Sequence, residues 1–337
     1  MPSSLEARLQ QAAPSRRSTI TTLLLLIGAA CSLGTAQAQT DKPITMVVGY
    51  SAGGSADSVA RIAATALSAA LKRQVIVENV PGASGILAAN KVVNSPADGS
   101  IIYLGGSDTI LTPMVNANAR LDWEKALLPV GRIATSPLIF AVHKSSPYNT
   151  LPDLIAGLRK ADQKGLTYAV PGIGTSQHIY GAVISLRQKV AMTPVPYRGG
   201  SQIVVDLAGQ HVDAAVLALS TALPFLKDGT IKALSVSDTP RVAQLPNVKP
   251  ISEEKDFADV SLPIWQGLFL KAGTPPATVD AYTQAMAQAL ESPEVRKKLS
   301  DAGFAVAPMN GTELQAFMKS QAAFYRGVVK TLKLTTE

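Results

Sequence analysis

Residues 44–57 read ITMVVGYSAGGSAD, and this pattern decides the first unit of the fold. The apolar run at 44–48 predicts a strand, and the Ala-rich stretch at 58–71 predicts a helix. Gly53 and Gly54, in the turn between them, have no Cβ and let a ligand approach the backbone closely. Backbone N–H groups at the start of a helix are unpaired, and the helix dipole adds positive charge there. The stretch therefore predicts an anion-binding turn.

A second turn of this kind lies at residues 169–178, which read AVPGIGTSQH. It follows a β-like run at 166–168 and precedes a helical pattern. We expect the two turns to face each other across a cleft and to hold one small carboxylate. The candidate ligand-binding residues are Tyr50, Ala52, Gly53, Gly54, Ser55 and Asp57 in the first turn, Gly172, Gly174, Thr175, Ser176 and His178 in the second, and Ser107 and Tyr197 outside them.

Each candidate also has an ordinary structural interpretation. Either turn alone is typical of a strand-to-helix connection, and only their pairing favours a ligand site. Ser107 follows the strand predicted at 100–104, and it either lines the ligand wall or caps a helix. Tyr197 either offers its hydroxyl to the ligand or fills the interface beside Pro196. His178 either reaches the cleft or has a structural role as a packing or capping residue. Four hydrogen bonds to a charged group, each worth roughly 1.5–3 kcal/mol, would match a micromolar complex at about 8 kcal/mol.

The rest of the chain alternates strand and helix patterns in two series. At 337 residues it exceeds the usual size of a single core, so two α/β lobes with a cleft between them are expected. An apolar segment at 262–268 returns to the first lobe, which gives two crossovers and a hinge. The expected domains are a signal peptide at 1–38, a first lobe at 39–142 and 263–337, and a second lobe at 143–262.

The first residues have the pattern of an export signal. Arg16 and Arg17 precede an apolar run at 23–34, and small residues at 36–38 predict cleavage after Ala38. The run is too short for a permanent anchor, and the arginine pair only loosely resembles a twin-arginine signal, so general secretion to the periplasm is favoured. Cleavage would remove Cys31, which is the only cysteine, and with it any disulfide, thiolate metal site or cysteine nucleophile.

Charge and motifs exclude several classes of function. The net charge of +7 suits small anions, but no basic run is interleaved with aromatic residues, which argues against nucleic acid. Motifs of serine hydrolases, P-loop proteins and zinc proteases are missing, and the GIG at 172–174 lacks the third glycine of a dinucleotide fingerprint. We therefore expect no enzyme, cofactor or metal. The alternatives are a periplasmic hydrolase, in which Asp57, His178 and a serine meet, and a ligand-presenting partner of a sensor kinase.

An ordered set of short motifs resembles one family of receptors. The motifs are GYSAGGSAD at 49–57, VENVPGASG at 77–85, GIGTSQH at 172–178, VPYRG at 195–199, GQHVD at 209–213, GL at 267–268 and AGTP at 272–275. Together they resemble the periplasmic solute-binding receptors of tripartite tricarboxylate transporters, the Bug or TctC-type family. The resemblance implies a monomeric two-lobe, Venus-flytrap fold that closes on a small carboxylate and delivers it to a membrane permease. By position, its two ligand loops are 50–57 and 172–178.

Overall fold

The computed structural model describes residues 42–116, 118–160, 165–237 and 241–334. The expected signal peptide and its cleavage after Ala38 lie outside the described residues. The residues from Pro43 onward form one compact unit, which contains two β-sheets. Within the described ranges, no helix is both long and apolar enough to cross a membrane.

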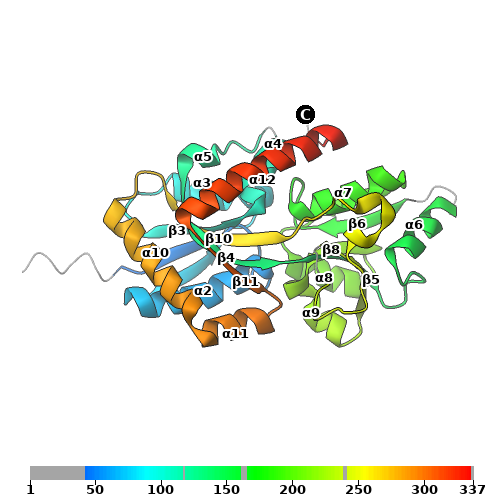
Figure 1. The fold of residues 1–337 in the computed structure, drawn as a ribbon, viewed down its shortest axis with the longest axis horizontal. Coiled ribbons are helices and arrows are strands. Elements are labelled where there is room, and N and C mark those ends of the chain that lie inside the picture. The colour runs from blue at the N-terminus through cyan, green and yellow to red at the C-terminus, as the bar shows by residue number, and fades with distance from the viewer. Residues whose placement is uncertain (1–41, 117, 161–164, 238–240, 335–337) are drawn as a thin grey trace, which may run out of the picture. The chain divides into compact units, whose positions relative to one another are not determined.

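The first lobe is built on a six-stranded sheet with the order β11-β4-β10-β3-β1-β2 (Figure 1). β1 pairs in parallel with β2 and β3, while β10 runs antiparallel to β3 and β4. The elements of this lobe are β1 (Ile44–Val48), α2 (Ser55–Leu71), β2 (Val75–Asn79), α3 (Ile86–Val93), β3 (Ile101–Gly106), α4 (Ser107–Val115), α5 (Trp123–Ala126), β4 (Leu127–Ser136), β10 (Ile264–Lys271), α10 (Pro276–Glu291), α11 (Pro293–Asp301), β11 (Ala305–Asn310) and α12 (Gly311–Leu332).

The second lobe is built on a five-stranded sheet with the order β7-β6-β8-β5-β9. β6 pairs in parallel with β7 and β8, and β5 runs antiparallel to β8 and β9. Its elements are β5 (Leu138–His143), α6 (Leu151–Lys160), β6 (Leu166–Val170), α7 (Ser176–Gln188), β7 (Met192–Pro196), α8 (Gly200–Ala208), β8 (Ala214–Ala218), α9 (Leu219–Lys227) and β9 (Ile231–Val236).

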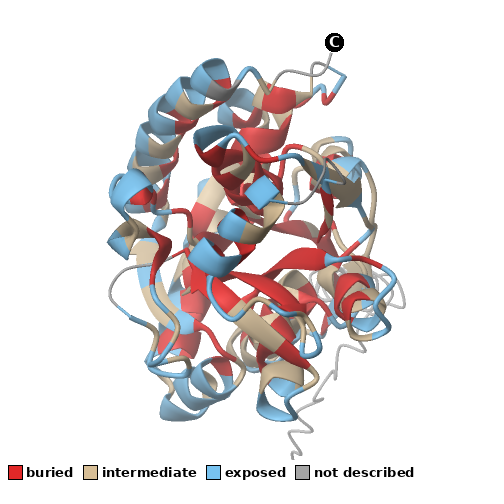
Figure 2. Ribbon diagram, turned by 90° about the vertical axis from the view of Figure 1, so that its right-hand side faces the viewer, coloured by how far each residue is buried: buried red, intermediate tan, exposed pale blue. Residues whose placement is uncertain are grey.

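Apolar patterning explains how each lobe forms. In α2 the residues Val59, Ala63 and Leu67 recur at helical spacing, and all three are buried in one cluster with Met46 and Val48 of β1. β8 is buried along its whole length, as expected of a strand covered on both faces. Figure 2 shows the same layering, with buried residues on the strands and exposed residues on the outer faces of the helices.

The chain crosses between the sheets twice, as the sequence predicts. The first crossing falls at Pro137, between β4 and β5, rather than at the expected boundary of 142/143, because β5 pairs only with strands of the second sheet. The return falls between Leu262, whose N–H donates to Ser237 O, and Ile264 at the start of β10. The apolar stretch at 127–142 contains both β4 and β5, separated only by Pro137, so its composition does not show where the chain leaves the first sheet.

The sequence analysis does not single out one strand of the first sheet. β11 pairs antiparallel with β4 at the edge of this sheet. Pro308 and the partly exposed pattern of this strand fit an edge position, where a missing N–H does not interrupt a ladder.

Candidate ligand-binding site between the lobes

The two predicted turns come from different lobes, and each of them is hydrogen-bonded to the opposite lobe. In the first lobe, Ser51 N donates to Arg198 O at 3.1 Å. In the other direction, Ser201 Oγ of the second lobe donates to Ala52 O at 2.9 Å. A third link runs from Ser84 Oγ to Ile173 O at 2.7 Å. The lobes are therefore in contact along the edge of the predicted cleft.

Two glycines of the second turn permit this close approach. Gly172 and Gly174 have φ of 146° and 80°, values that favour glycine. A Cβ on Gly172 would collide with Ser84 Oγ, and one on Gly174 would lie 3.3 Å from Thr112 Cα. Both obstacles belong to the first lobe, so side chains at these positions would hold the lobes apart.

A small cavity of ≈ 50 Å³ lies between the lobes. Since one water needs about 10–15 Å³ measured in this way, the cavity has room for a ligand with only a few non-hydrogen atoms. Its first-lobe wall comes from the first turn and α4, and its second-lobe wall comes from the starts of α7, α8 and α9. The lining residues are Tyr50, Gly54, Ser55, Ala56, Asp108, Pro171, Gln177, Gly200, Ile203, Val216, Leu217, Ala218 and Thr221.

Three helices begin at this cavity without a side-chain cap. α2, α8 and α9 follow the N-cap residues Gly54, Gly199 and Ala218, and among the described residues no side chain caps them. Their first turns supply lining residues, so the positive ends of their dipoles lie at the cavity. The first N–H of α9, that of Leu219, already donates to Pro137 O at 2.9 Å. Such an arrangement stabilises an anion without a cationic side chain.

Asp108 is the charged residue of the lining that the sequence analysis did not select. It is the second residue of α4 and crosses to the second lobe, where Ser176 N donates to its Oδ1 at 3.0 Å. Tyr50 OH donates to the other carboxylate oxygen. Burial raises the pKa of the Asp108 carboxyl, and the hydrogen bonds from Tyr50 and Ser176 oppose this rise. Burial, together with the Asp108 charge, also raises the pKa of Tyr50 well above its usual range.

The N–H groups of the second turn therefore already have hydrogen-bond partners within the protein. Thr175 caps α7 by accepting a hydrogen bond from His178 N, and it donates to Gly172 O at 2.8 Å. Asp108 accepts the N–H of Ser176, as described above. Gly174 N, expected to contact the ligand, donates instead to His178 Nδ1 at 3.4 Å.

In the first turn, Asp57 holds the loop rather than lining the cavity. Its carboxylate accepts hydrogen bonds from Gly53 N at 2.9 Å, Arg61 Nε at 2.9 Å and Asn79 Nδ2 at 3.0 Å. Burial raises the pKa of this carboxyl, but the three donors outweigh burial and leave the pKa below its usual value. Asn79 also donates to Tyr50 O, so Asp57 fixes the turn that carries the cavity residues.

The remaining predicted residues lie around the cavity. Ser107 is buried beside Asp108 but is not part of the lining. His178 is only 7% exposed, and burial lowers its pKa to about 4, so its ring is neutral at pH 7. Tyr197 lines an open pocket of ≈ 610 Å³ next to the cavity, together with Tyr50. Burial, then the hydrogen bond that its hydroxyl donates to Asp206, raises the pKa of Tyr197 to about 12.

Two glutamine oxygens near the cavity lack hydrogen-bond partners. Gln177 lines the cavity, is 8% exposed, and its Oε1 accepts no hydrogen bond. Gln266 of β10 is 5% exposed and has the same unmet Oε1, while its Nε2 donates to Ser55 Oγ at 3.4 Å. Buried acceptors without partners are rare, and here they favour a ligand that donates hydrogen bonds.

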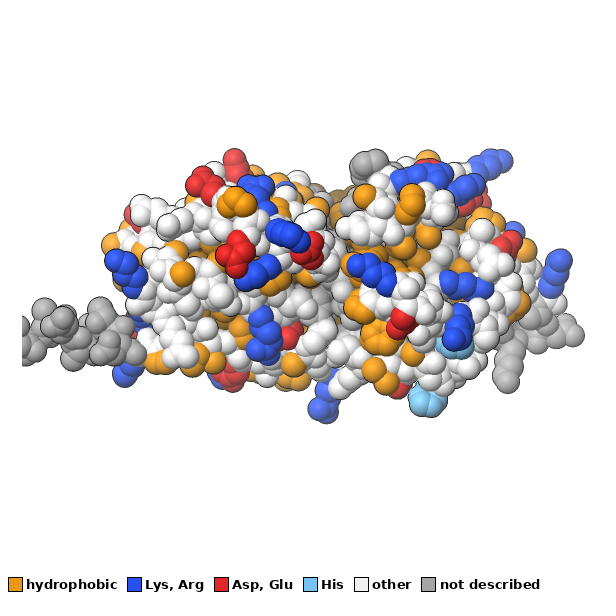
Figure 3. Space-filling view, turned by 90° about the horizontal axis from the view of Figure 1, so that it is seen from below, with side chains coloured by type: hydrophobic (Ala, Val, Ile, Leu, Met, Phe, Trp, Pro, Cys, Tyr) orange, Lys and Arg blue, Asp and Glu red, His pale blue; other side chains and the backbone are white. Residues whose placement is uncertain are grey.

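The described residues offer no metal site, and the two residues suggested for a hydrolase are not hydrogen-bonded to each other. Nowhere in the described ranges do three His, Cys, Asp or Glu side chains gather as metal ligands. Asp57 and His178, suggested for a hydrolase, belong to separate hydrogen-bond networks. On the face drawn in Figure 3, Lys and Arg side chains are scattered among acidic ones rather than gathered in one patch.

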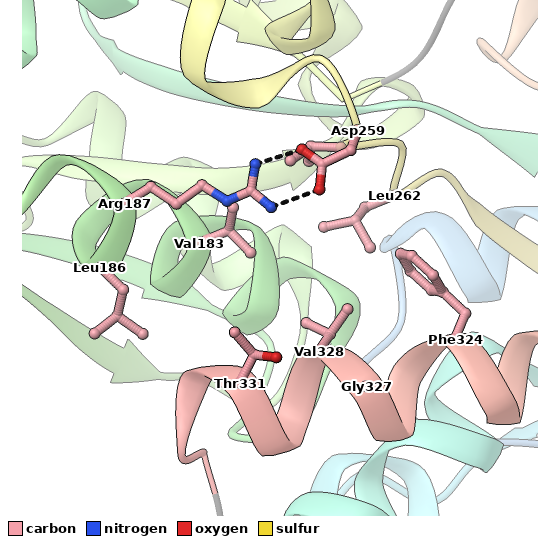
Figure 4. A pocket seen from close by; sticks show the side chains of 10 residues that line it. Val183, Leu186, Arg187, Asp259, Leu262, Phe324, Gly327, Val328 and Thr331 are labelled. Atoms are coloured by element: carbon pink, nitrogen blue, oxygen red, sulfur yellow. Dashed lines mark hydrogen bonds and ion pairs between the residues drawn. The ribbon is translucent and has the colours of Figure 1, made fainter.

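A larger groove of ≈ 600 Å³ lies away from the turns, between α7 and α12 (Figure 4). It is lined by apolar side chains such as Leu186 and Phe324, with an ion pair between Arg187 and Asp259 above it. The Arg187 hydrogen bonds lower the pKa of Asp259 to about 2. None of the predicted ligand residues lines this groove.

Two sheets joined by two crossovers, with a cavity between them, are typical of the class of periplasmic binding proteins. Solved structures of that class match the chain closely. The periplasmic binding protein BugD gives a TM-score of 0.83 at 26% identity, covering 88% of this chain and 99% of that one. A protein of R. palustris solved with adipate gives 0.82 at 27% identity, covering 86% and 97%. MatC of Rhodopseudomonas palustris, solved with bound malate, gives 0.78 at 26% identity, covering 85% and 98%.

Sequence comparison identifies the family. The model of the tripartite tricarboxylate transporter family receptor, TctC, matches residues 59–334. A UPF0065 protein of Cupriavidus necator, from the gbd 5′ region, is 30% identical over 305 residues, which are 89% of this chain and 91% of that protein. The chain therefore belongs to the TctC family of solute-binding receptors, and it is a receptor rather than an enzyme. The expected resemblance and the expected two-lobe α/β fold are confirmed.

Proposed function

We propose that this receptor captures a small carboxylate between its lobes in the periplasm and delivers it to a permease of the tripartite tricarboxylate type. The observation that carries the proposal is the meeting of three helix N-termini at one small cavity. The starts of α2, α8 and α9 line the same small volume, and their N-cap residues make no side-chain cap hydrogen bond. The lining contains no Lys, Arg or His among the described residues, so the donors for a carboxylate are the positive ends of these helices together with hydroxyl groups such as those of Ser55 and Thr221.

The position of the cavity also supports capture by closure. Its lining comes from both lobes, and the lobes already exchange hydrogen bonds beside it, such as Ser201 Oγ to Ala52 O. A ligand that touches both walls stabilises the closed arrangement by its differential contacts. The proteins solved with adipate and malate share the fold at 26–27% identity, which supports a carboxylate as the ligand class.

Calorimetric titration of the mature receptor with a panel of carboxylates tests the binding step. The panel includes malate, adipate, acetate, succinate and the corresponding amino acids, and each acid is paired with its neutral methyl ester or amide. We expect at least one acid to bind with a micromolar dissociation constant, about 8 kcal/mol, and its neutral counterpart to bind at least tenfold more weakly. If every acid fails to bind, or if neutral analogues bind equally well, carboxylate capture is wrong.

Uptake measurements test delivery. The labelled ligand found by titration is offered to vesicles that contain the cognate permease subunits, with and without the receptor. We expect uptake only when the receptor is present. Binding without receptor-dependent uptake would separate capture from transport and would contradict the delivery step alone.

A further inference from the structure

The groove between α7 and α12 is built by both lobes and shares no residue with the lining of the ligand cavity (Figure 4). Its first-lobe wall is α12 and its second-lobe wall is α7, with Leu262 of the return crossing beside them. Leu186 and Phe324 line it and are 48% and 43% exposed. Among the described residues only five large apolar residues are exposed, and two of them meet in this one hollow. Such a surface is available to apolar groups of a partner.

Gly327 lines the same groove, and the fold does not explain why this residue is glycine. It lies inside α12, where glycine is less favourable than alanine. Among the described residues, a Cβ at this position would meet no atom within 4 Å. Every other described glycine has either a positive φ or an atom close to its missing Cβ, as Gly181 has at Tyr168. Gly327 therefore leaves space for a group from outside the chain.

One side of α12 presents positive charge next to Gly327. Because a helix turns about 100° per residue, Phe324 and Lys330 flank Gly327, each turned by about 60° but in opposite directions. Lys319 and Arg326 lie on the Lys330 side of the helix, and all three cations are exposed. In the described part of the chain, none of the three forms an ion pair. Their charge is available to a partner.

The charges on the opposite side of the groove are already matched. Arg187 of α7 forms a bidentate ion pair with Asp259, in which Nη2 donates to Oδ2 at 2.8 Å. This pair leaves no net charge on its side, so the cations of α12 set the charge that a partner needs. A segment that fits the surface has apolar side chains for the hollow and acidic side chains toward Lys330.

We propose that this groove docks an acidic amphipathic segment of the membrane permease, with its apolar side chains between Leu186 and Phe324 and its backbone close to Gly327. The acidic side chains of the segment contact the cations of α12. This inference rests on the proposed delivery to a permease and names the docking surface. α7 lines the ligand cavity at Gln177 and the groove at Leu186, so a single helix joins the two sites.

Two other occupants fit the surface less well. A symmetric dimer through this groove would place the α12 helices of two copies against each other, and residues 319–334 contain four cations and no Asp or Glu. A lipid bilayer presents a flat surface, whereas Leu186 and Phe324 line a hollow. A protruding acidic segment of a protein matches both the charge and the shape.

Co-sedimentation of the mature receptor with vesicles measures docking. Vesicles of phosphatidylethanolamine and phosphatidylglycerol contain the cognate permease subunits, protein-free vesicles of the same lipids are the comparison, and both contain the acid that binds most tightly in the titration panel. We expect the wild type to bind the permease vesicles roughly tenfold more tightly or better. Equal binding to both would assign the surface to anionic lipid and overturn the inference. A wild type that binds neither would overturn the inference and the delivery step together, while carboxylate capture would stand.

Gly327→Trp fills the groove without a clash, because no described atom lies near the position of its Cβ. We expect it to bind the permease vesicles roughly tenfold more weakly, with the melting temperature and the carboxylate affinity of the wild type. Wild-type docking by this variant would overturn the inference and leave delivery intact. Gly327→Ala should melt at the same temperature as the wild type or higher. A lower melting temperature would mean that the fold itself requires this glycine, which contradicts the inference.

Lys330→Glu tests the charge, with Lys227→Glu as the matched control. Both are exposed lysines in the last turn of a helix, so their reversal has a similar effect on the helix dipole. We expect Lys330→Glu to dock about threefold to tenfold more weakly and Lys227→Glu to dock like the wild type. Equal losses would indicate attraction to the overall charge of the protein and overturn the assignment to the groove. Sedimentation equilibrium tests the second copy, and a wild-type dimer that Gly327→Trp dissociates would overturn the permease as the occupant.

Discussion

The two glycine turns have nearly the same sequence pattern but different roles in the structure. Both follow a parallel strand and start a helix, at α2 and at α7. In the first turn, the Asp57 carboxylate binds Gly53 N within the loop. The N-terminus of α2 has no side-chain cap and lies at the cavity. In the second turn, Thr175 caps the helix and Asp108 occupies Ser176 N–H. Both turns can bind an anion. Such a turn is available to a ligand only where no carboxylate of the protein already occupies it.

Making the first turn resemble the second should have the largest effect. Ser55→Asp places a carboxylate on the open N-terminus of α2, in the wall of the cavity. A like charge about 4 Å away costs roughly 4 kcal/mol at an effective dielectric constant of 20, so we expect the affinity for carboxylates to fall about 1000-fold. The stability of the free protein should stay the same or rise by about 0.3–1 kcal/mol, because the charge complements the helix dipole.

Calorimetric titration and chemical denaturation measure these two effects. Thr65→Asp is the matched control, since it adds the same charge to an exposed site further along α2. The control should bind normally. Normal binding by Ser55→Asp itself would mean that α2 does not hold the carboxylate.

In acid, we expect the second turn to lower the free energy of unfolding, because it contains His178. His178 is buried with a pKa of about 4, against about 6.5 in the unfolded chain. Between these values the unfolded state binds more protons, so stability is complete above about pH 6.5 and falls as the pH drops toward 4. The shift corresponds to a loss of about 3 kcal/mol by pH 4, which denaturation at a series of pH values measures.

The His178→Gln variant isolates this effect from the other titrating groups. Glutamine keeps an acceptor near Gly174 N but does not titrate. Between pH 6.5 and 4, the wild type should lose about 3 kcal/mol of unfolding free energy through His178, and the His178→Gln variant should not show most of this loss. Parallel pH profiles of the two proteins would show that this ring does not cause the acid sensitivity.

Removing the cap of the second turn should have the smallest effect. Thr175→Val keeps the shape but loses the hydrogen bonds to His178 N and Gly172 O, and we expect a cost of about 1–2 kcal/mol. Ser58→Ala in the first turn, where the hydroxyl donates only to Gly54 O, should cost less than about 0.5 kcal/mol. Urea denaturation compares the two, and equal costs would contradict the difference between the turns.

The sequence predicted the two lobes and the two turns, because strand–turn–helix patterns are local. It missed Asp108 because α4 begins immediately after β3, with no loop between them. Neighbouring residues on a helix point about 100° apart, so the exact starting residue decides whether Ser107 or Asp108 faces the cavity. The same holds for Gln177 and His178 at the start of α7. The rotational position of a residue around a helix cannot be read from composition or spacing. Tyr50, Gly54 and Ser55, which line the cavity, could be selected because glycines mark the first turn in the sequence.

The two crossovers lie side by side in the fold. They leave the first sheet at β4 and β10, which are hydrogen-bonded neighbours, with Ser136 paired to Ile264 at the point of exit. Since both covalent links between the lobes run through this pair of strands, we expect any movement of one lobe relative to the other to be centred there. The change of backbone angles on closing would then be concentrated in a few residues that lie outside the cavity lining.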